Sequence, residues 1–589
     1  MKRFLKRKVS TSEPDGGGIG GESSNGNVSH NNPEPSSTPS MAREVDMNDL
    51  SWDIVPTIQK DIVHCFAQEV LKAISEEISD DVFALLVDGS NAIPKRKQMV
   101  VVLRYVTCGI VKERFIGFVH VMETDALSLK SAIESLFVEY GLSLKKVRGQ
   151  SYNGASNMHV GFNGMKTLVK RENNLAYYVH CFAHRLQSVV VTVAKEHLEV
   201  GKFFDMIDVM INAVCASCKP KDMIRESQRE KVQEAIGNGE IETESGLKQE
   251  ISHVKPEDIR WGSYYKTLLY LVDLFPSVVE VLAYVEEVGV NPFSQRKAYD
   301  LQVYFQSFDF VFYLHLMLHI LGVTDLLSQA LQRRDEDILN AISLVKSTKQ
   351  LLQKFKVDGF HSLLKMTSSF SEKHDIEMLN LDDEYVNPKI PRQKTNITYR
   401  HYYEFHCFNT IVDMQIEEFD DRFSGVSSEL LICMAALNPR DSFCDFNPSK
   451  LLRLTELYPD DFSCVEKVTL EPELYLYIDS VQQDERFANL KGISDLARVM
   501  VETRLHLTFP LVYRLLKLAL VLPVATATVE SCFSAIELVK SDLRDRICDD
   551  FYDSCVSSAV EEKGVANVTN EDVMNHIEKM KARMNDLRM

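Results

Sequence analysis

Hydrophobic and polar positions in the first folded segment repeat with the period of a helix. Residues 58–78 place their large apolar side chains on one helical face, at Ile58, Ile62, Phe66, Val70 and Ile74. The period then shortens. Three apolar segments at 82–88, 99–106 and 114–121 follow one another closely, and this pattern predicts three β-strands joined by turns.

A second helix, two more strands and a third helix complete this unit. Gly141 stands where a helix commonly ends in the left-handed conformation, after a face made by Leu129, Ile133, Leu136, Phe137 and Tyr140. A fourth strand is predicted at 144–149, leading into the loop SYNGASNM at 151–158. A helix at 160–171 and a fifth strand at 176–180 follow. This order predicts an α/β layer with a mixed sheet.

The remaining residues change to helical periodicity. From 185 to 520 the long segments are helical, separated by acidic or proline-containing loops. Near the end, LVYRLLKLALVLP predicts an apolar helix that stops at Pro523, and FYDSCVSSAV predicts another. Between them a helical face is formed by Val529, Cys532, Phe533, Ile536 and Val539. The fold class expected is therefore α/β plus all-α.

Composition narrows the class of protein. Residues 9–45 are rich in Ser, Gly, Asn and Pro and contain too few apolar side chains to fold, so the first 48 residues are expected to be a disordered tail. The twelve cysteines are scattered, which is typical of reduced thiols in an intracellular protein. No stretch of about 18 consecutive apolar residues occurs, so no membrane span is expected.

The net charge of the chain limits how it can bind nucleic acid. The net charge of −19 excludes a protein that coats DNA through overall basicity, so any DNA contact must come from local patches. The cluster formed by Lys2, Arg3, Lys6, Arg7 and Lys8 is either a nuclear localisation signal or a solvated basic end.

Five motifs in one order resemble the hAT (hobo–Activator) transposase superfamily. They are Asp88 after the first strand, RGQSYNGASNM, CFAHRL, RWGSYY at 260–265, and ATATVESCFSAIELVKSDLRDRICDDF. More narrowly, the chain resembles plant hAT-derived proteins with a TTF-type zinc finger and a C-terminal hAT dimerisation region, although that zinc finger is absent here. The resemblance covers residues 50 to 560 and implies an RNase H-like core split by a large α-helical insertion.

This resemblance implies five segments. They are a tail at 1–48, the first part of the core at 49–200, the helical insertion at 201–504, the dimerisation region that completes the core at 505–562, and a tail helix at 563–589.

The resemblance also implies a catalytic site. Family members cleave and transfer DNA strands with three carboxylates that hold two Mg²⁺ ions. By motif, these positions fall on Asp88, Asn153 and Glu530, and only the first and the last are acids. Gly89 replaces a further acid of the motif, and Ser531 replaces an arginine. These departures favour a domesticated or decayed protein without strand cleavage, in which Asp88 and Glu530 remain as candidate metal ligands. An active Mg²⁺-dependent transposase is the alternative.

Two further sets of residues have competing interpretations. Cys181-x-x-His184 and Cys215-x-x-Cys218 have spacings that suit zinc, yet cysteine is also a common buried apolar residue. The resemblance implies that Cys181 and His184 form a structural element beside the core. Arg260-Trp261 resembles an element whose Trp stacks on an unpaired DNA base, and the alternative is a core tryptophan.

Together these observations predict a nuclear, transposase-derived protein that forms a homodimer through its C-terminal helices and contacts DNA. Mg²⁺ is the cofactor expected if the protein is active, and none otherwise. The central insertion is expected to cover part of the apolar stretch ALVLPVATATVESCFSAIELV. The rest, with FYDSCVSSAV, is expected to face the partner, because exposed apolar surface marks contacts between proteins. A third hypothesis is a protein-interaction scaffold without DNA contact, which agrees with the acidic charge.

Overall fold

The computed structural model divides the chain into a unit at Met1–Val55 and a unit at Pro56–Met589, and it describes most of the second. The predicted tail and its basic cluster lie outside the described residues, as do Arg260 and Cys218. The described ranges are 56–93, 96–121, 123–154, 159–215, 219–220, 222–226, 229–230, 261–289, 291–386, 395–423, 429–543 and 549–586.

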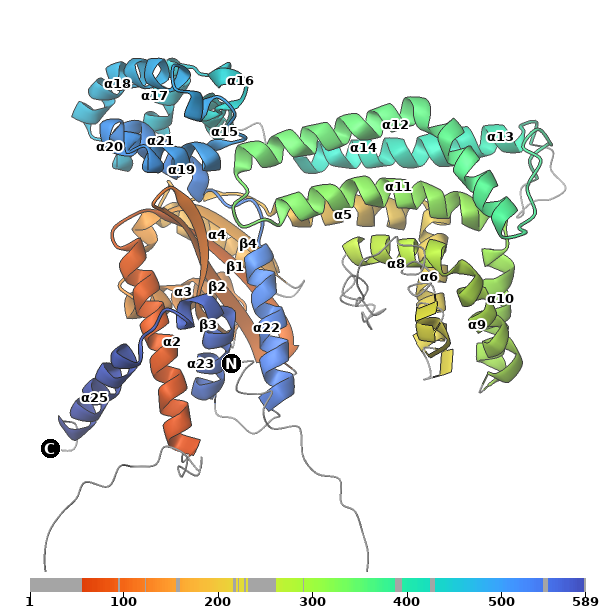
Figure 1. The fold of residues 1–589 in the computed structure, drawn as a ribbon, viewed down its shortest axis with the longest axis horizontal. Coiled ribbons are helices and arrows are strands. Elements are labelled where there is room, and N and C mark those ends of the chain that lie inside the picture. Colours follow the sequence, from red (N-terminus) through yellow and green to blue (C-terminus); the bar gives the residue numbers. More distant parts are fainter. Residues whose placement is uncertain are drawn as a thin grey trace, which may run out of the picture. The chain divides into compact units, whose positions relative to one another are not determined.

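A five-stranded mixed sheet forms the centre of the α/β part (Figure 1). Its strands are β1 (Phe83–Ile93), β2 (Arg96–Thr107), β3 (Ile110–Val121), β4 (Val147–Gly154) and β5 (Tyr177–Tyr178). The order across the sheet is β3-β2-β1-β4-β5. Strands β1 to β3 pair antiparallel, whereas β4 runs parallel to both β1 and β5. The predicted mixed sheet of five strands is confirmed.

The fourth strand begins later than the pattern predicts. Residues Leu144–Lys146 form a 3₁₀ turn (η1), because the side chain of Ser143 accepts a hydrogen bond from the backbone N–H of Lys145. Strand β4 then pairs with β1 from Val147 as far as Gly154. The first half of the predicted loop SYNGASNM is therefore strand.

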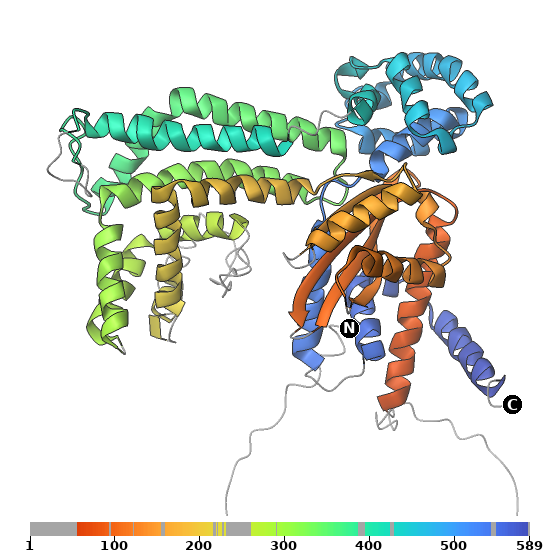
Figure 2. The ribbon, with the colours of Figure 1, turned by 180° about the vertical axis from the view of Figure 1, so that it is seen from behind.

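Helices α2 (Pro56–Ile78), α3 (Ala126–Glu139) and α4 (His159–Glu172) cover one face of the sheet (Figure 2). Gly141 has a φ of 68° and ends α3 as predicted. The N–H of Leu142 bonds the carbonyl of Phe137 at 2.8 Å, and the N–H of Gly141 bonds the carbonyl of Val138 at 3.3 Å. This pair of bonds is the Schellman motif that satisfies the last carbonyls of a helix.

The other face is covered by residues from both halves of the sequence. Helix α5 (Phe182–Glu196) contributes to the same hydrophobic core as α21 (Pro510–Val521), α22 (Ala527–Leu543) and α23 (Asp549–Val560). Helix α22 contacts β1, β2 and β3, and α23 contacts β3 and α2. Helix α2 also contacts α24 (Glu562–Val565) and α25 (Asn570–Asp586). The C-terminal helices thus complete the core, and the helix that carries Glu530 packs on the sheet as predicted.

This packing contradicts the premise for the predicted dimer interface. Leu520, Val524, Val529 and Ile536 are buried within the single chain, and Val556 of α23 is buried as well. The sheet and the neighbouring helices cover the apolar surface that was expected to face a partner. Homodimerisation remains a prediction without that support.

A long helical bundle contains four of the intervening helices. Helices α5, α11 (Phe308–Leu331), α12 (Ile338–Lys373) and α14 (Thr410–Phe423) contact one another and lie side by side in both views (Figures 1 and 2). A π-helical segment at Tyr402–Asn409 continues α13 (Tyr399–His401) into α14. Four more helices pack beside α5 and α11, either directly or through one another. They are α6 (Leu198–Cys215), α8 (Trp261–Asp273), α9 (Phe275–Val288) and α10 (Pro292–Phe305).

A second helical group follows the bundle and reaches the sheet through α19, α21 and the turn η7. Its elements are α15 (Glu429–Met434), η6 (Ala435–Leu437), α16 (Arg440–Phe443), α17 (Pro448–Leu457), η7 (Pro459–Asp461), α18 (Cys464–Gln482), η8 (Glu485–Phe487), α19 (Ile493–Glu502) and α20 (Leu505–Thr508), before α21. We call α15 to α21 the helical cap.

Within the described residues, α11 has the length and apolar composition of a membrane span, and the bent pair α8–α9 passes the same test. In α11, 61% of the apolar window is buried against the rest of the chain. A core helix of this kind has the same composition as a span, so the pattern is weak support for a membrane segment.

Candidate functional site

Two of the three predicted catalytic positions are neighbours in the sheet. Parallel pairing of β1 with β4 sets Asp88 directly beside Asn153. Asp88 is buried, and it lies on the same face of β1 as Ala84 and Leu86, which pack in the core with α22. Residues at matched positions of neighbouring strands share a face of the sheet. Position 153 is therefore on the α22 face, although its side chain lies outside the description.

The third position approaches from the C-terminal part of the chain. Glu530 lies in the first turn of α22, and its N–H bonds the carbonyl of Thr526 at 3.0 Å. Burial raises the pKa of the Cys181 thiol, and the carboxylate of Glu530 raises this pKa further, which places Glu530 near the start of α5. Asp88 and position 153 thus lie on the face of the sheet that α22 covers, and Glu530 lies in the first turn of α22. That the three positions form one site remains a prediction.

Cys181 has a structural role at this place. Its sulfur accepts the N–H of His184 at 3.4 Å, capping α5, and the N–H of Thr526 at 3.4 Å. The N–H of Phe182 also bonds the carbonyl of Val524 at 2.9 Å. These bonds join the start of α5 to the segment before α22, so Cys181 fixes where Glu530 enters the site.

The zinc and base-stacking hypotheses stay as predictions. Among the described side chains, no group of three or more His, Cys, Asp or Glu residues could hold a metal ion. The side chain of Cys215 lies outside the description. Trp261 is the first residue of α8, and its side chain also lies outside the description. The ring of His184 lies 5.7 Å from the ring of His180.

The Mg²⁺ implied by the resemblance fits this site poorly. Two metal ions held by three carboxylates require anionic oxygen at each position, because Mg²⁺ is a hard cation that keeps its water unless anionic ligands replace it. Here Asp88 and Glu530 supply two carboxylates, and position 153 supplies a neutral amide. We therefore derive no metal-dependent step at this site.

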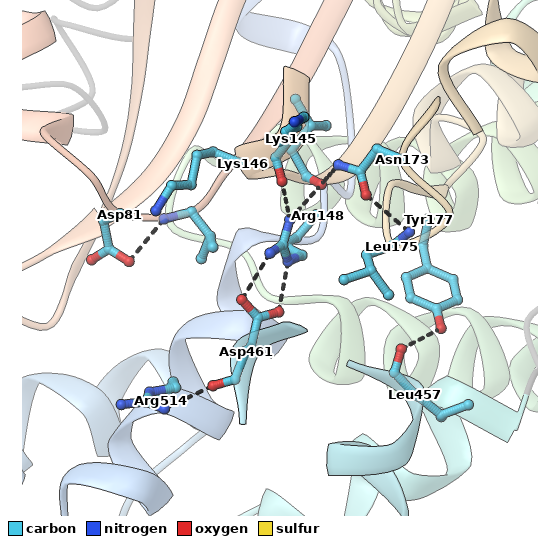
Figure 3. Close-up of polar contacts among 12 residues, drawn as sticks. Asp81, Lys145, Lys146, Arg148, Asn173, Leu175, Tyr177, Leu457, Asp461 and Arg514 are labelled. Atoms are coloured by element: carbon cyan, nitrogen blue, oxygen red, sulfur yellow. Dashed lines mark hydrogen bonds and ion pairs between the residues drawn. The ribbon is translucent and has the colours of Figure 1, made fainter. Parts of the chain in front are cut away.

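An ion pair that pattern reasoning missed fixes the other end of β4 (Figure 3). Arg148 Nε and Nη2 donate to the two carboxylate oxygens of Asp461, at 2.6 and 2.8 Å. Arg148 Nη1 donates to the carbonyl of Lys145 at 2.7 Å, and Arg514 Nη1 donates to the carbonyl of Asp461 at 2.7 Å. Both partners of the ion pair are largely buried, with 5% and 10% of their side chains exposed. This contact anchors the strand of position 153 to the helical cap.

A second buried arginine connects three parts of the chain. Arg104 of β2 donates to Glu113 of β3 at 2.8 Å and to the carbonyl of Leu520 in α21 at 3.0 Å. It also donates to the carbonyls of Arg334 at 3.1 Å and Glu336 at 2.7 Å, in the loop between α11 and α12. Arg104 therefore joins the sheet, the helical cap and the long bundle at one point.

Comparisons with known proteins agree with the α/β architecture of the part that contains the sheet. A family model described as "DUF4371: ZMYM1/FAM200, RNase-like domain" matches residues 38–164, a range that contains β1 to β4. The chain is similar to the "52 kDa repressor of the inhibitor of the protein kinase" of Mus musculus, with 23% identity over 503 residues. Its similarity to the Homo sapiens protein of that name is 22% identity over 504 residues.

Each alignment covers 82% of this chain and 62% of the relative. The chain thus spans less than two thirds of the length of these relatives. In sum, an RNase-like domain built on a mixed sheet lies at the start of a chain that is distantly similar to these repressors.

Proposed function

We propose that this chain is a regulatory protein derived from a hAT transposase, which binds DNA and self-associates in the nucleus but does not cleave DNA strands. The RNase-like match, the mixed sheet and the C-terminal helices that complete the core support a transposase origin. The word "repressor" in the names of the two relatives supports a regulatory role.

One observation supports the proposal that the protein does not cleave DNA strands. The parallel register pairs Asp88 with an asparagine at position 153, where strand cleavage by two metal ions needs an acid. A neutral amide oxygen can still approach a metal ion, but it supplies none of the charge that offsets the loss of hydration. The site therefore binds Mg²⁺ weakly and holds the attacking oxygen poorly.

Metal binding and cleavage test this part of the proposal. Freshly purified wild type and Asn153→Asp are titrated with Mg²⁺ by calorimetry and incubated with terminal-repeat DNA and Mg²⁺. We expect weak Mg²⁺ binding and no strand cleavage for wild type. Mg²⁺-dependent cleavage by wild type that mass spectrometry shows to be undeamidated would identify an active transposase instead.

DNA binding has an independent test, because the acidic charge of the chain favours a scaffold without DNA contact. We expect a mobility shift with duplex or single-stranded DNA that weakens as salt increases, since phosphate contacts release counterions. No shift at low salt would favour the scaffold. Light scattering of the full chain at micromolar concentration tests self-association.

A further inference from the structure

Helix α18 of the helical cap carries apolar side chains on both of its faces. Its inner face is buried and contains Leu470, Leu474, Tyr477 and Val481. Its outer face is exposed, with Val465 at 73%, Val468 at 76%, Tyr475 at 56% and Leu476 at 65% of their full exposure. A surface helix normally turns polar residues to the solvent, so an apolar outer face calls for an explanation.

The exposed residues form one continuous stripe. Val465, Val468, Pro472 and Tyr475 follow one another at alternating spacings of three and four, the spacing with which one helix packs against another. Pro472 is also exposed, and Leu476 lies beside Tyr475. From Val465 to Leu476 the stripe is about 16 Å long at the rise of an α-helix, enough for three turns of a second helix. We call these five residues the α18 stripe.

Among the residues that the structure describes, the contacts that hold α18 in the fold do not involve this stripe. Ser463 and Glu466 form a capping box at the start of α18, and Arg514 bonds Glu466 at 2.9 Å. Glu473 accepts the N–H groups of Leu511 at 2.9 Å and Val512 at 3.0 Å, capping α21. All these contacts hold α18 in place from its inner side and its start, which leaves a rigid outer surface.

The charge around the stripe selects the partner. Helix α18 contains four acidic residues and one lysine. Glu466 and Glu473 bond groups of the helical cap, whereas Glu471 and Asp479 are exposed along the stripe, where Asp479 accepts a hydrogen bond from the neighbouring Gln483 at 2.9 Å. A second copy that docked through the same stripe would bring Glu471 and Asp479 against acids of the same kind, and an anionic lipid surface would repel them as well.

We propose that the α18 stripe is a docking surface for an amphipathic helix with basic flanks, presented by a partner protein. The apolar face of that helix covers the α18 stripe, and its Lys or Arg residues approach Glu471 and Asp479. The proposal concerns the helical cap alone and does not rest on the function proposed for the core.

The test uses the full chain and two labelled peptides of about 18 residues, a length that forms a helix on binding. One peptide is built of Leu and Lys, and the other places Glu at the Lys positions. Fluorescence anisotropy measures the binding of each peptide. We expect the Leu–Lys peptide to bind at least about tenfold more tightly than the Leu–Glu peptide, a difference of about 1.4 kcal/mol.

Matched variants locate the binding. Val468→Lys and Leu476→Lys should each weaken binding of the Leu–Lys peptide about tenfold, because they remove apolar contact and repel its lysines. Val357→Lys makes the same change at a residue of α12 that is 80% exposed and lies outside the stripe, and should change the affinity less than about twofold. Glu471→Lys should weaken binding more than Asp358→Lys, an exposed acid of α12.

Three results would overturn the proposal. The first is equal affinity for the two peptides, or an equal loss of affinity for the Leu–Lys peptide in Val468→Lys and Val357→Lys. Either outcome means that the stripe does not recognise the peptide. The second is a dimer in sedimentation that Val468→Lys dissociates, which would identify a second copy as the partner. The third is binding to anionic phospholipid vesicles that Val468→Asp abolishes, which would identify a membrane.

Discussion

The two ends of strand β4 differ in whether the charged groups required there are present. At its start, Arg148 is buried and its guanidinium is matched by both carboxylate oxygens of Asp461. At its far end, position 153 beside Asp88 lacks the charge that strand cleavage requires. The requirements of folding are satisfied at one end, while those of catalysis are unmet at the other. Under the proposed function, β4 keeps its structural role without a role in strand cleavage.

The largest effect should come from the architectural end. Arg148→Met removes the positive charge and leaves Asp461 buried without its partner, so we expect the free energy of unfolding to fall by about 3–5 kcal/mol. Chemical denaturation followed by circular dichroism measures this loss. Arg498→Met is the matched control, because Arg498 pairs with Asp495 and Glu502 at the surface.

The control should lose less than about 1 kcal/mol, as expected for exposed pairs. If Arg148→Met were no more destabilised than Arg498→Met, the contact between β4 and the helical cap would not anchor the strand. The comparison between the two ends of β4 would then fail.

The next effect concerns another contact between the sheet and the helical cap. Gly109, in the turn between β2 and β3, has a φ of 75°, and a Cβ there would lie 2.6 Å from the carbonyl oxygen of Ala497. Its N–H also bonds the hydroxyl of Tyr513 at 2.9 Å. Gly109→Ala combines left-handed strain with overpacking and should cost about 2–4 kcal/mol.

Gly141→Ala separates these two causes. Gly141 has a φ of 68°, yet a Cβ there would meet nothing within 4 Å. Its substitution should therefore cost only the strain, about 1 kcal/mol. Equal losses in the two variants, measured as shifts of the thermal midpoint, would show that the helical cap does not press on the turn at Gly109.

A smaller effect should appear as a dependence of stability on pH. Burial raises the pKa of Glu336, in the loop that Arg104 holds against the sheet, to about 7, with a further contribution from Asp337. Because the folded state holds this proton more tightly, the stabilisation is full below the unfolded pKa and is lost as pH rises through about 7. Glu336→Gln should gain about 1–3 kcal/mol over wild type at pH 8 and little at pH 4.

Urea denaturation of both proteins from pH 4 to pH 8 measures this difference. Other groups also have shifted pKa values; a hydrogen bond from Arg333, for example, lowers the pKa of Asp335. These groups are the same in both proteins, so the difference between wild type and variant isolates the contribution of Glu336. A difference that stays constant with pH would show that Glu336 does not titrate in this range.

Periodicity predicted the elements that bury one face. The face of α3 is an example, because a helix with one buried side leaves a contrast at every third or fourth residue and Gly141 marks its end. The helix of Glu530 was found in the same way, through Val529, Cys532 and Ile536. The prediction that Asp88, position 153 and Glu530 share one site came from the family resemblance, since no local pattern links residues so far apart.

Local patterns could not supply the remaining features. Arg148 and Asp461 are separated by 313 positions, and either residue alone looks like an ordinary surface charge. The late start of β4 depends on one hydrogen bond, which the side chain of Ser143 accepts from the N–H of Lys145. Helix α18 has apolar residues on both faces, so its sequence shows no contrast that tells the buried face from the exposed one. The burial of the apolar stretch near Val529 could not be predicted either, because periodicity does not reveal how much apolar surface a sheet covers.

The smallest effect on stability, and the most direct test of the comparison, is Asn153→Asp. The added carboxylate beside Asp88 should raise the affinity for Mg²⁺ by about tenfold, because a third anion offsets more of the ion's lost hydration. Without metal it repels Asp88 and Glu530, so the free energy of unfolding should fall by less than about 1 kcal/mol. Mg²⁺ should reverse that loss, since a ligand that binds only the folded state stabilises it.

Asp88→Asn, introduced into the Asn153→Asp variant, is the matched control and should abolish the added affinity for Mg²⁺. Calorimetry and thermal unfolding with and without Mg²⁺ measure both effects, after mass spectrometry has excluded deamidation of the Asn153-Gly154 pair. Equal Mg²⁺ affinity in wild type and Asn153→Asp would show that position 153 does not belong to a metal site, and the contrast between the two ends of β4 would lose its chemical meaning.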